Sequence, residues 1–419
     1  MPNEPISAVL CGDLNMLRCF ASTPIATAIV SSDPDDLALH SRSCRRQFII
    51  ADPFTQPHQA LNDLVAVGKA LPGRPVLFYG SDPFLLLVSR NRHALERYYN
   101  LLLPSQQLIE DLTSKVRFTS LAERLHLPVP ATVLSHDVTT ARQALRAVSL
   151  PCILKPNCHV GWSAATVAQS HQQWPQKALR ADTLEQFERL FAGMLASTDD
   201  FVIQQYIPGD ATSIYSFHTY FDRASIPLGY FVGRKIRTYP GESGISTYLQ
   251  LVHEPQVVRL GIQILKTLNY VGLCKLDFKK DAAKNRFYLL EANARFTLWN
   301  YLGAASGVNL PILAYRDILA LPCQPATSYT TGIRWLSFMN DLKTFLKSYH
   351  PDRQLSFAQW LLSLQGRKVY DVFSWRDPLP FMVSIIRDIT MRSRRLIRFP
   401  RHTASDTLAS TPRPTTPIP

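Results

Sequence analysis

The stretch Phe287-Tyr288-Leu289-Leu290-Glu291-Ala292-Asn293-Ala294-Arg295 places polar residues at alternate positions of an otherwise apolar segment. Successive side chains of a β-strand point to opposite faces, so Glu291, Asn293 and Arg295 are expected on one side. A carboxylate and an amide oxygen coordinate Mg²⁺, and a guanidinium pairs with a phosphate. The stretch therefore predicts a site for a nucleoside triphosphate.

A second carboxylate, Asp277, lies one strand earlier, in Cys274-Lys275-Leu276-Asp277-Phe278. The polar segment 279–285 is typical of a hairpin turn, and a hairpin would bring Asp277 beside Glu291. Either residue alone is equally well explained as a surface residue on an ordinary strand. The whole set on one hairpin is much harder to explain in that way.

Short apolar runs alternate with helical patterns over residues 6–103. The expected strands are residues 6–10, 26–30, 47–50 and 76–79. Strands separated by helices predict a parallel, doubly wound sheet, in which ligands bind beyond the carboxyl ends of the strands. Gly12, Asp13, Ser81 and Asp82 stand at such ends. Because Asp and Gly are also common turn formers, a binding role and a simple turn are equally supported.

The hairpin resembles the nucleotide-binding hairpin of the ATP-grasp superfamily. In that superfamily two lysines approach the nucleotide phosphates. Lys115 resembles the first, and Lys155, which closes the apolar strand Ile153-Leu154-Lys155-Pro156, resembles the second. A lone lysine is usually a solvated charge, but one at the end of a buried strand is costly without a partner. The loop that follows, residues 157–164, holds one glycine where family members cover the phosphates, so the match is weak there.

Residues 201–210 resemble the hinge strand whose backbone reads the adenine edge. The family usually has a glutamate where this chain has Gln204 and Gln205, and an amide can still bond to the adenine amino group. An acidic residue that follows, Asp210, is implied as the ligand of the ribose hydroxyls. The residues implied for nucleotide binding are Lys115, Lys155, Gln204, Gln205, Tyr206, Ile207 and Asp210.

Two further cations, Lys235 and Arg237, lie two positions apart in a strand-like segment. They are expected to share a face and to reach a γ-phosphate or an acyl phosphate. The alternative is an exposed edge strand protected by charge. The neighbouring motifs favour the phosphate role.

Within the superfamily the chain is most similar to carboxylate–amine ligases related to D-aspartate ligase and the carbamoyl-phosphate synthase large chain. The resemblance covers roughly residues 6–320. It implies ATP-dependent amide formation through an acyl phosphate, with Arg295, Lys235 and Arg237 in catalysis. It also implies Mg²⁺, or Mn²⁺ in its place, held by Asp277, Glu291 and Asn293. Asp277 stands where glutamate is usual, Ala294 where proline is usual, and Ser114 where an acid is common.

The expected fold is α/β, and α+β in the ATP-binding part. A Rossmann-like domain at residues 1–105 precedes an ATP-grasp domain at residues 106–322. A small C-terminal unit at residues 323–401 and a disordered tail at residues 402–419 follow. The tail is rich in Thr, Pro and Ser and has no apolar period.

Part of the formal net charge of +13 is local, because residues 387–401 hold six arginines against one acid, Asp388. Such a segment suits an anionic membrane, nucleic acid or phosphorylated substrates, or it is a solvated basic tail. Nothing resembling a nucleic-acid-binding motif accompanies it. The apolar residues between the arginines either insert into a membrane or pack on the C-terminal unit.

The seven cysteines are scattered without a CxxC pair, which favours reduced thiols over a zinc site. With no secretory signal and no apolar run long enough to span a bilayer, the expected location is the cytoplasm, or the inner face of the membrane. The expected partners are small carboxylates and amines, such as amino acids or an envelope-linked amine. Three alternatives stay open: a carboxylase or kinase of the same superfamily, a nucleotide-binding pseudoenzyme, and a basic membrane- or nucleic-acid-binding module. The acid, the amine and the oligomeric state are not specified by the sequence.

Overall fold

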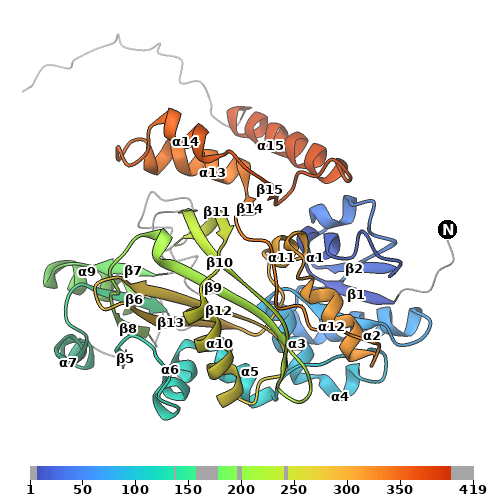
Figure 1. Ribbon diagram of the computed structural model, residues 1–419, viewed down its shortest axis with the longest axis horizontal. Helices are drawn as coiled ribbons and strands as arrows, with labels where there is room; N and C mark the ends of the chain where they lie inside the picture. Colours follow the sequence, from blue (N-terminus) through green and yellow to red (C-terminus); the bar gives the residue numbers. More distant parts are fainter. Residues whose placement is uncertain (1–6, 136–137, 157–177, 196–200, 240–243, 398–419) are drawn as a thin grey trace, which may run out of the picture.

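The computed structural model describes residues 7–135, 138–156, 178–195, 201–239 and 244–397 (Figure 1). The strands are β1 (Ala8–Cys11), β2 (Thr27–Ser31), β3 (Arg46–Ile49), β4 (Val76–Tyr79), β5 (Thr132–Ser135), β6 (Cys152–Pro156), β7 (Leu179–Ala181), β8 (Phe201–Gln205), β9 (Ile214–Phe221), β10 (Pro227–Tyr239), β11 (Ile245–Leu251), β12 (Gly272–Asp281), β13 (Arg286–Asn293), β14 (Arg334–Leu336) and β15 (Lys368–Tyr370). The α-helices are α1 (Leu14–Arg18), α2 (Pro57–Ala70), α3 (Asp82–Arg90), α4 (Arg92–Leu95), α5 (Gln106–Thr113), α6 (Lys115–Arg124), α7 (Val138–Val148), α9 (Leu184–Leu195), α10 (Pro255–Thr267), α11 (Asn300–Ser306), α12 (Leu310–Ile318), α13 (Phe338–Thr344), α14 (Phe357–Ser363) and α15 (Leu379–Ile397). Three short helices are η1 (Leu37–His40), η2 (Ala211–Ser213) and η3 (Phe345–Tyr349).

The first sheet is parallel and has the strand order β3-β2-β1-β4. Strands β1, β2 and β4 are buried throughout, which is why they read as continuous apolar runs, whereas the edge strand β3 is mostly exposed. Val9 and Leu77 pack with α2 and α3 on one face, whereas Ala8 and Phe78 pack with α1 on the other. The doubly wound parallel sheet predicted from the sequence is confirmed.

The second sheet has seven strands in the order β13-β12-β9-β10-β11-β14-β15. Its neighbours are antiparallel except for the last pair, β14 and β15. These two strands belong to the C-terminal unit, and Trp335 of β14 is buried with residues of the first two sheets. The C-terminal unit therefore extends the sheet as well as being attached to it.

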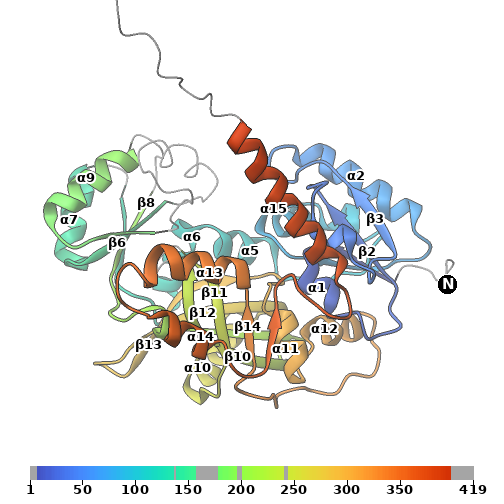
Figure 2. The ribbon, with the colours of Figure 1, turned by 90° about the horizontal axis from the view of Figure 1, so that it is seen from above.

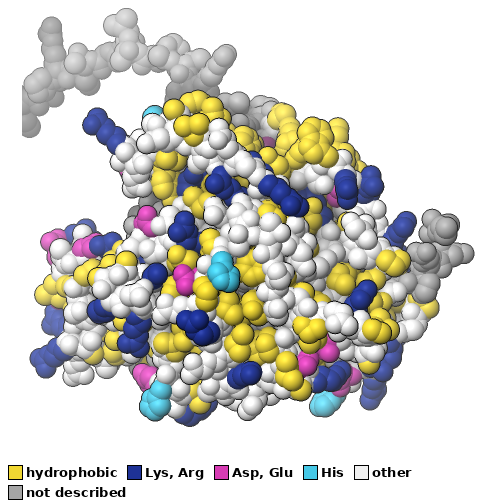
Figure 3. Space-filling view, viewed as in Figure 1, with side chains coloured by type: hydrophobic (Ala, Val, Ile, Leu, Met, Phe, Trp, Pro, Cys, Tyr) yellow, Lys and Arg dark blue, Asp and Glu magenta, His cyan; other side chains and the backbone are white. Residues whose placement is uncertain are grey.

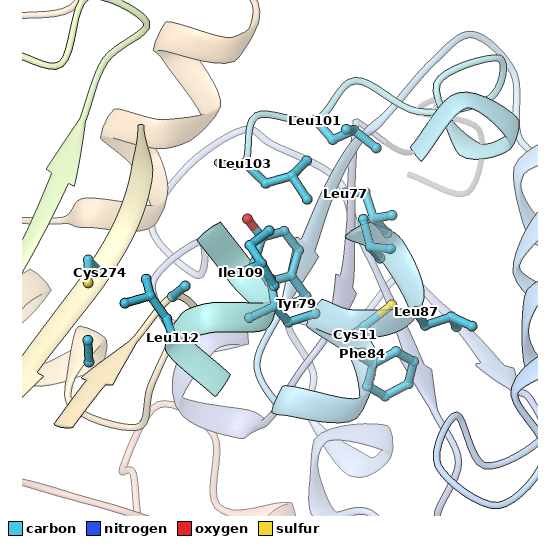
Figure 4. Packing of buried hydrophobic residues seen from close by; sticks show 14 of the residues in the cluster. Cys11, Leu77, Tyr79, Phe84, Leu87, Leu101, Leu103, Ile109, Leu112 and Cys274 are labelled. Carbon is cyan, nitrogen blue, oxygen red and sulfur yellow. The ribbon is translucent and has the colours of Figure 1, made fainter. Parts of the chain in front are cut away.

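The third sheet has four strands in the order β5-β8-β6-β7 and is antiparallel. Helices α7 and α9 cover it, and its own apolar cluster holds Phe191, which stacks on Phe187 and meets Phe201 edge to face. The first two sheets differ, because they share two apolar clusters. Figure 4 shows one of these, which contains Leu77 and Tyr79 of the first sheet, Leu112 of α5 and Cys274 of β12.

The shared clusters contain residues from both sides of residue 105, where the sequence predicts the first domain boundary. The boundaries at residues 105, 322 and 401 stay predictions. Residues 402–419 and the phosphate-covering loop 157–164 lie outside the described residues.

The C-terminal unit is tied to the first sheet by polar contacts. Arg18 of α1 donates to the carbonyl of Asp371 at 3.1 Å, and the Ser41 hydroxyl donates to Asp377 at 2.7 Å. Helix α15 crosses from this unit over the first sheet (Figure 2). Within the described residues, no helix combines the length and the apolar character that crossing a bilayer requires. The cysteines that the structure describes are all unpaired.

Candidate active site

A cavity of about 530 Å³ is lined by residues of all three sheets and of the helices that join them. Gly80 and Asp82 reach it from the first sheet, Glu291 from the second and Val202 from the third. The predicted site residues among its lining are Lys115, Lys155, Gln204, Gln205, Tyr206, Ile207, Lys235, Asp277, Glu291, Asn293 and Arg295. One cavity thus collects residues that lie as much as 180 positions apart in the sequence.

The predicted hairpin is formed by β12 and β13, and Asp277 pairs with Glu291 across it. Asp277 and Asn293 are buried, whereas Glu291 is exposed to the cavity. The Asp277 carboxylate pairs with the Lys275 ammonium at 2.8 Å and accepts a hydrogen bond from the Ser216 hydroxyl. Burial raises the pKa of Asp277, but the charges of Lys275 and Lys235 lower it by more, so that its pKa lies well below the usual range. The carboxylate is therefore ionised at neutral pH.

Arg295 joins the hairpin to the first sheet. Its Nε lies 2.5 Å from Asp82 Oδ1, and its Nη2 donates to Asn293 Oδ1 at 3.3 Å. Asp82 begins α3, directly after the edge of the parallel sheet where ligands are expected. Asp13 also lines the cavity and caps α1 by accepting from the backbone N–H groups of Asn15 and Met16. Both expected loops of the first sheet thus face the cavity.

Lys155 lies at the other side of the cavity, in β6. Its Nζ donates to Gln204 Oε1 at 2.8 Å, and Gln204 Nε2 donates to Thr132 Oγ1 at 2.9 Å. Burial lowers the pKa of Lys155 to about 8; Glu291 opposes this shift, and Lys115 and Lys279 add to it. Burial and the neighbouring lysines disfavour the charged form of Lys155. An anionic ligand bound beside it would stabilise that charged form.

The lining residues that were not predicted from the sequence include three cations and a tryptophan: Arg180, Lys275, Lys279 and Trp299. Arg180 and Lys279 lie over the ring of Tyr206 at 4.1 and 4.8 Å, and Lys275 lies over Trp299 at 5.2 Å. Such cation–π contacts hold the cations in place. Two of them could have been predicted from strand alternation, because Lys275 and Lys279 lie two positions before and after Asp277 and so share its face.

Arg237 does not line the cavity, in contrast to the expectation that it shares a face with Lys235. The pairing of β10 with β11 shifts between Lys235 and Arg237, so Ile236 forms a β-bulge. A bulge inserts one unpaired residue and interrupts the alternation of faces. The Arg237 guanidinium instead donates to both carboxylate oxygens of Asp341, each at 2.8 Å. Its role is therefore a structural ion pair between the large sheet and the C-terminal unit.

Asp210 also lies outside the cavity lining. It is exposed and caps the short helix η2, accepting from the Thr212 backbone N–H at 2.9 Å and from its hydroxyl at 2.7 Å. The ribose role implied for Asp210 stays a prediction.

The expected metal ligands are a set of hard oxygen donors. Where the structure describes the chain, no three His, Cys, Asp or Glu side chains cluster in a way that could hold a metal ion. Asp277, Glu291 and Asn293 do not form such a cluster, because only two of them are carboxylates and the third offers an amide oxygen. All three lie on a single hairpin. Mg²⁺ is bound through few carboxylates together with substrate phosphates, so this donor set fits it.

No protein-family model matches the chain. It is 22% identical to the D-aspartate ligase of Enterococcus faecium over 243 residues, which cover 56% of each chain. It is 24% identical to the arginine-specific carbamoyl phosphate synthase large chain of Lactiplantibacillus plantarum over 218 residues, 51% of this chain and 20% of the relative. The chain therefore matches about half the length of the first relative and a fifth of the second.

Solved structures match more of the chain. One is an ADP complex of N5-carboxyaminoimidazole ribonucleotide synthetase, with a TM-score of 0.59 and 13% sequence identity. The match covers 78% of this chain and 80% of the synthetase. The L-amino acid ligase of Bacillus licheniformis covers 75% of this chain and is itself covered to 75%, with a TM-score of 0.57 and 15% identity. At such identities the likeness establishes a common fold.

Proposed function

We propose that this chain, which has the ATP-grasp fold, is an ATP-dependent carboxylate–amine ligase. It would join a carboxylate to an amine through an acyl phosphate and release ADP and phosphate. The observation that carries the proposal is the cavity itself, in which Lys155 and Arg295 line the same space as Asp277 and Glu291 of the hairpin. Cations and paired carboxylates around one space suit a nucleoside triphosphate and a second anion.

The small sheet would bind the nucleotide. Gln204, Gln205, Tyr206 and Ile207 would contact the adenine, and Lys115 and Lys155 would contact its phosphates. Lys155 is already oriented by Gln204, so little reorganisation is needed when phosphate arrives. The ADP complex among the structural neighbours supports a nucleotide in this fold.

Asp277, Glu291 and Asn293 would hold Mg²⁺, or Mn²⁺ in its place. When bound, the ion supplies positive charge to the phosphate oxygens. The low pKa of Asp277 keeps one of these ligands ionised at neutral pH.

The reaction would use two displacements. A carboxylate oxygen of the substrate forms a bond to the γ-phosphorus, and the bond between that phosphorus and ADP breaks. The amine nitrogen then bonds to the acyl carbon, inorganic phosphate leaves, and the amine loses a proton. Lys235 and Arg295, which line the cavity, would offset the charge on the transferred group. Since an acyl phosphate hydrolyses readily, the walls also serve to exclude water.

The acid and the amine would bind at the end of the cavity formed by the first sheet, where Asp13 and Asp82 line the space and Asp82 pairs with Arg295. The D-aspartate ligase and the L-amino acid ligase among the relatives support amino acids as substrates. An amine linked to the cell envelope would suit the same chemistry. We place the enzyme in the cytoplasm, where ATP is available and unpaired thiols persist.

Turnover with panels of amino acids tests the proposal. Purified protein is given MgATP and pairs of amino acids, ADP release is measured, and the products are identified by mass spectrometry. We expect ADP release that depends on both an acid and an amine, with an amide of the two as product. ADP release that requires bicarbonate would indicate a carboxylase, and a stable phosphorylated product without amine would indicate a kinase. Failure to bind ATP by calorimetry would contradict all three.

A further inference from the structure

The C-terminal part of the chain carries an apolar surface that the proposed catalysis does not use. Its exposed large apolar residues include Phe357, Leu361 and Leu362 of α14, Trp375 before α15, and Leu379, Met382, Ile385, Ile386 and Ile389 of α15. Figure 3 shows hydrophobic side chains gathered at the top of the view, where Figure 1 places α14 and α15. Contiguous exposed apolar surface on a folded protein marks an interaction site.

The residues on α15 form one stripe. Leu379, Met382, Ile386 and Ile389 follow the spacing i, i+3, i+7 and i+10, which lies along one side of an α-helix. Ile386 and Ile389 are each 60% exposed. We call these four residues together with Trp375 the C-terminal apolar face.

The rest of the helix is fixed to the protein, which determines where this face points. Phe381 contacts Phe373 edge to face with ring centroids 5.2 Å apart. Farther along, Arg387 forms an ion pair of 2.9 Å with Asp35, next to η1. With its other side held at two places, α15 presents the C-terminal apolar face outward. The expectation that the apolar residues pack on the C-terminal unit is therefore not met for Ile386 and Ile389.

Trp375 is presented in the same region. It is 88% exposed, yet its ring meets Phe373 edge to face at 4.8 Å. Arg376, directly after it, is also exposed. An exposed tryptophan beside an arginine is typical of the polar boundary of a bilayer, where the indole ring lies among the headgroups.

The charge of the helix indicates what the face contacts. The sequence of α15 contains four arginines and a single acid, Asp388. The following residues to Arg401 add two more arginines, and the whole chain has a formal net charge of +13. Apolar residues interleaved with arginines on one helix suit a surface that is apolar beneath and anionic above.

We propose that the C-terminal apolar face docks on an anionic lipid bilayer, with α15 lying in the plane of the interface. Leu379, Met382, Ile386 and Ile389 would enter the acyl region, and the positive charge of the segment would attract it to the lipid phosphates. The chain would thus be peripherally bound. This proposal is independent of the proposed catalysis, since the face and the cavity share no residue.

Two other occupants fit less well. A second copy of the chain in a twofold contact would bring two arginine-rich helices together, because such a contact places the same patch on both partners. A nucleic acid would use the arginines but would leave the exposed isoleucines and Met382 without an apolar partner. A lipid bilayer satisfies both groups.

Vesicle sedimentation of the full chain tests the proposal. The probes are vesicles of phosphatidylcholine alone and vesicles that also contain phosphatidylglycerol. We expect the protein to bind the anionic vesicles at least about tenfold more strongly than the neutral ones, and the binding to weaken as salt is added. The variant Met382→Ser/Ile386→Ser/Ile389→Ser should lose at least about tenfold in binding to anionic vesicles. The matched control is Leu184→Ser/Ile226→Ser, which removes apolar residues exposed elsewhere and should bind as the parent does.

A second variant, Arg392→Gln/Arg394→Gln/Arg395→Gln, removes charge without touching an apolar residue. It should also lose anionic binding, whereas Arg142→Gln/Arg189→Gln, on helices of the third sheet, should not. Circular dichroism and ATP turnover without vesicles establish that each variant is folded. Equal and negligible binding of the parent chain to both vesicle types would overturn the proposal. So would a dimer in sedimentation velocity that the apolar variant abolishes, in the absence of vesicle binding.

Discussion

Two charged regions lie near opposite ends of the Lys235–Arg237 segment of β10. In the cavity, Lys235 and other cations surround a space of about 530 Å³ together with Asp277 and Glu291. At the junction with the C-terminal unit, the side chains of Arg237 and Asp341 are only 4% and 0% exposed. Similar residue types thus make an open site in one place and a closed one in the other.

The closed region is saturated with hydrogen bonds. Asp341 accepts from Arg237, from the Thr247 hydroxyl at 3.0 Å and from the Trp360 indole N–H at 2.9 Å. Arg237 also donates to the Ser363 hydroxyl at 3.0 Å. In the cavity, by contrast, Lys155 has its pKa lowered by burial and by neighbouring lysines. The comparison teaches that partners and free volume, more than residue type, distinguish a structural ion pair from a ligand site.

The largest effect is expected from removing the cavity carboxylate that faces the space. Glu291→Gln should lower ATP turnover by at least about 100-fold, because loss of one electrostatic group at a phosphoryl-transfer site has effects of this size. Its melting temperature should stay close to that of the parent, since Glu291 is exposed to the cavity. Turnover assays at saturating and limiting Mg²⁺ measure the first effect, and calorimetry measures the second.

Asn293→Ala should also lower ATP turnover strongly while the protein stays folded, although its burial makes some loss of stability expected. The matched control is Arg286→Gln, on the same strand, exposed and outside the cavity lining, which should turn over ATP at close to the parent rate. Parent-like turnover by folded Glu291→Gln at limiting Mg²⁺ would remove the metal assignment.

The next largest effect is expected on the free energy of unfolding. Here the variant outside the cavity should lose stability, whereas the variant in the cavity should mainly lose turnover. Arg237→Ala should lower the free energy of unfolding by about 3 kcal/mol or more, because it leaves Asp341 buried without its partner. Lys235→Ala, two positions away, should change it by less than about 1 kcal/mol while slowing turnover. Denaturant unfolding and turnover assays at low temperature separate the two. A stable, inactive Arg237→Ala would place Arg237 back in the site.

The sequence predicted the hairpin and the parallel sheet because their signals are local. Alternation fixes the face shared by Glu291 and Asn293, and a continuous apolar run marks β4 (Val76–Tyr79) at the predicted bounds. The bulge at Ile236 was missed because it depends on pairing with β11, which no pattern within β10 records. Arg180 was missed for a similar reason, since only the packing of the third sheet brings it over Tyr206.

A smaller effect is expected from pH. Because burial lowers the pKa of Lys155 to about 8, the free lysine loses its charge as the pH rises through that value. ATP affinity should therefore fall above about pH 8, and ATP binding near that pH should take up a proton, since phosphate favours the charged form. The free energy of unfolding should rise between about pH 8 and the ordinary lysine pKa, where the unfolded chain binds more protons. Calorimetry of ATP binding in buffers of different ionisation enthalpy measures the uptake.

Lys155→Met removes the titrating group and should abolish the proton uptake, as well as weakening ATP binding more than it lowers the melting temperature. Lys284→Met, at the exposed hairpin turn, is the control and should retain the uptake. An unchanged ATP affinity in Lys155→Met would return Lys155 to an ordinary surface role.

The smallest effect is expected from changing Gln204, the hydrogen-bond partner of Lys155. It tests whether this contact sets the protonation of Lys155. Gln204 Oε1 lies 2.8 Å from Lys155 Nζ, so Gln204→Glu would place a negative charge against the ammonium with little change in shape. An opposite charge at this distance favours the charged lysine and raises its pKa by about 1 unit or more. The proton uptake on ATP binding should then move upward in pH by the same amount, and ATP affinity at pH 7 should change little. Gln205→Glu adds the same charge to the next residue without the bond to Lys155, so its shift should be smaller. If both variants moved the uptake equally, the charge of the cavity as a whole, and not the contact with Gln204, would set the protonation of Lys155.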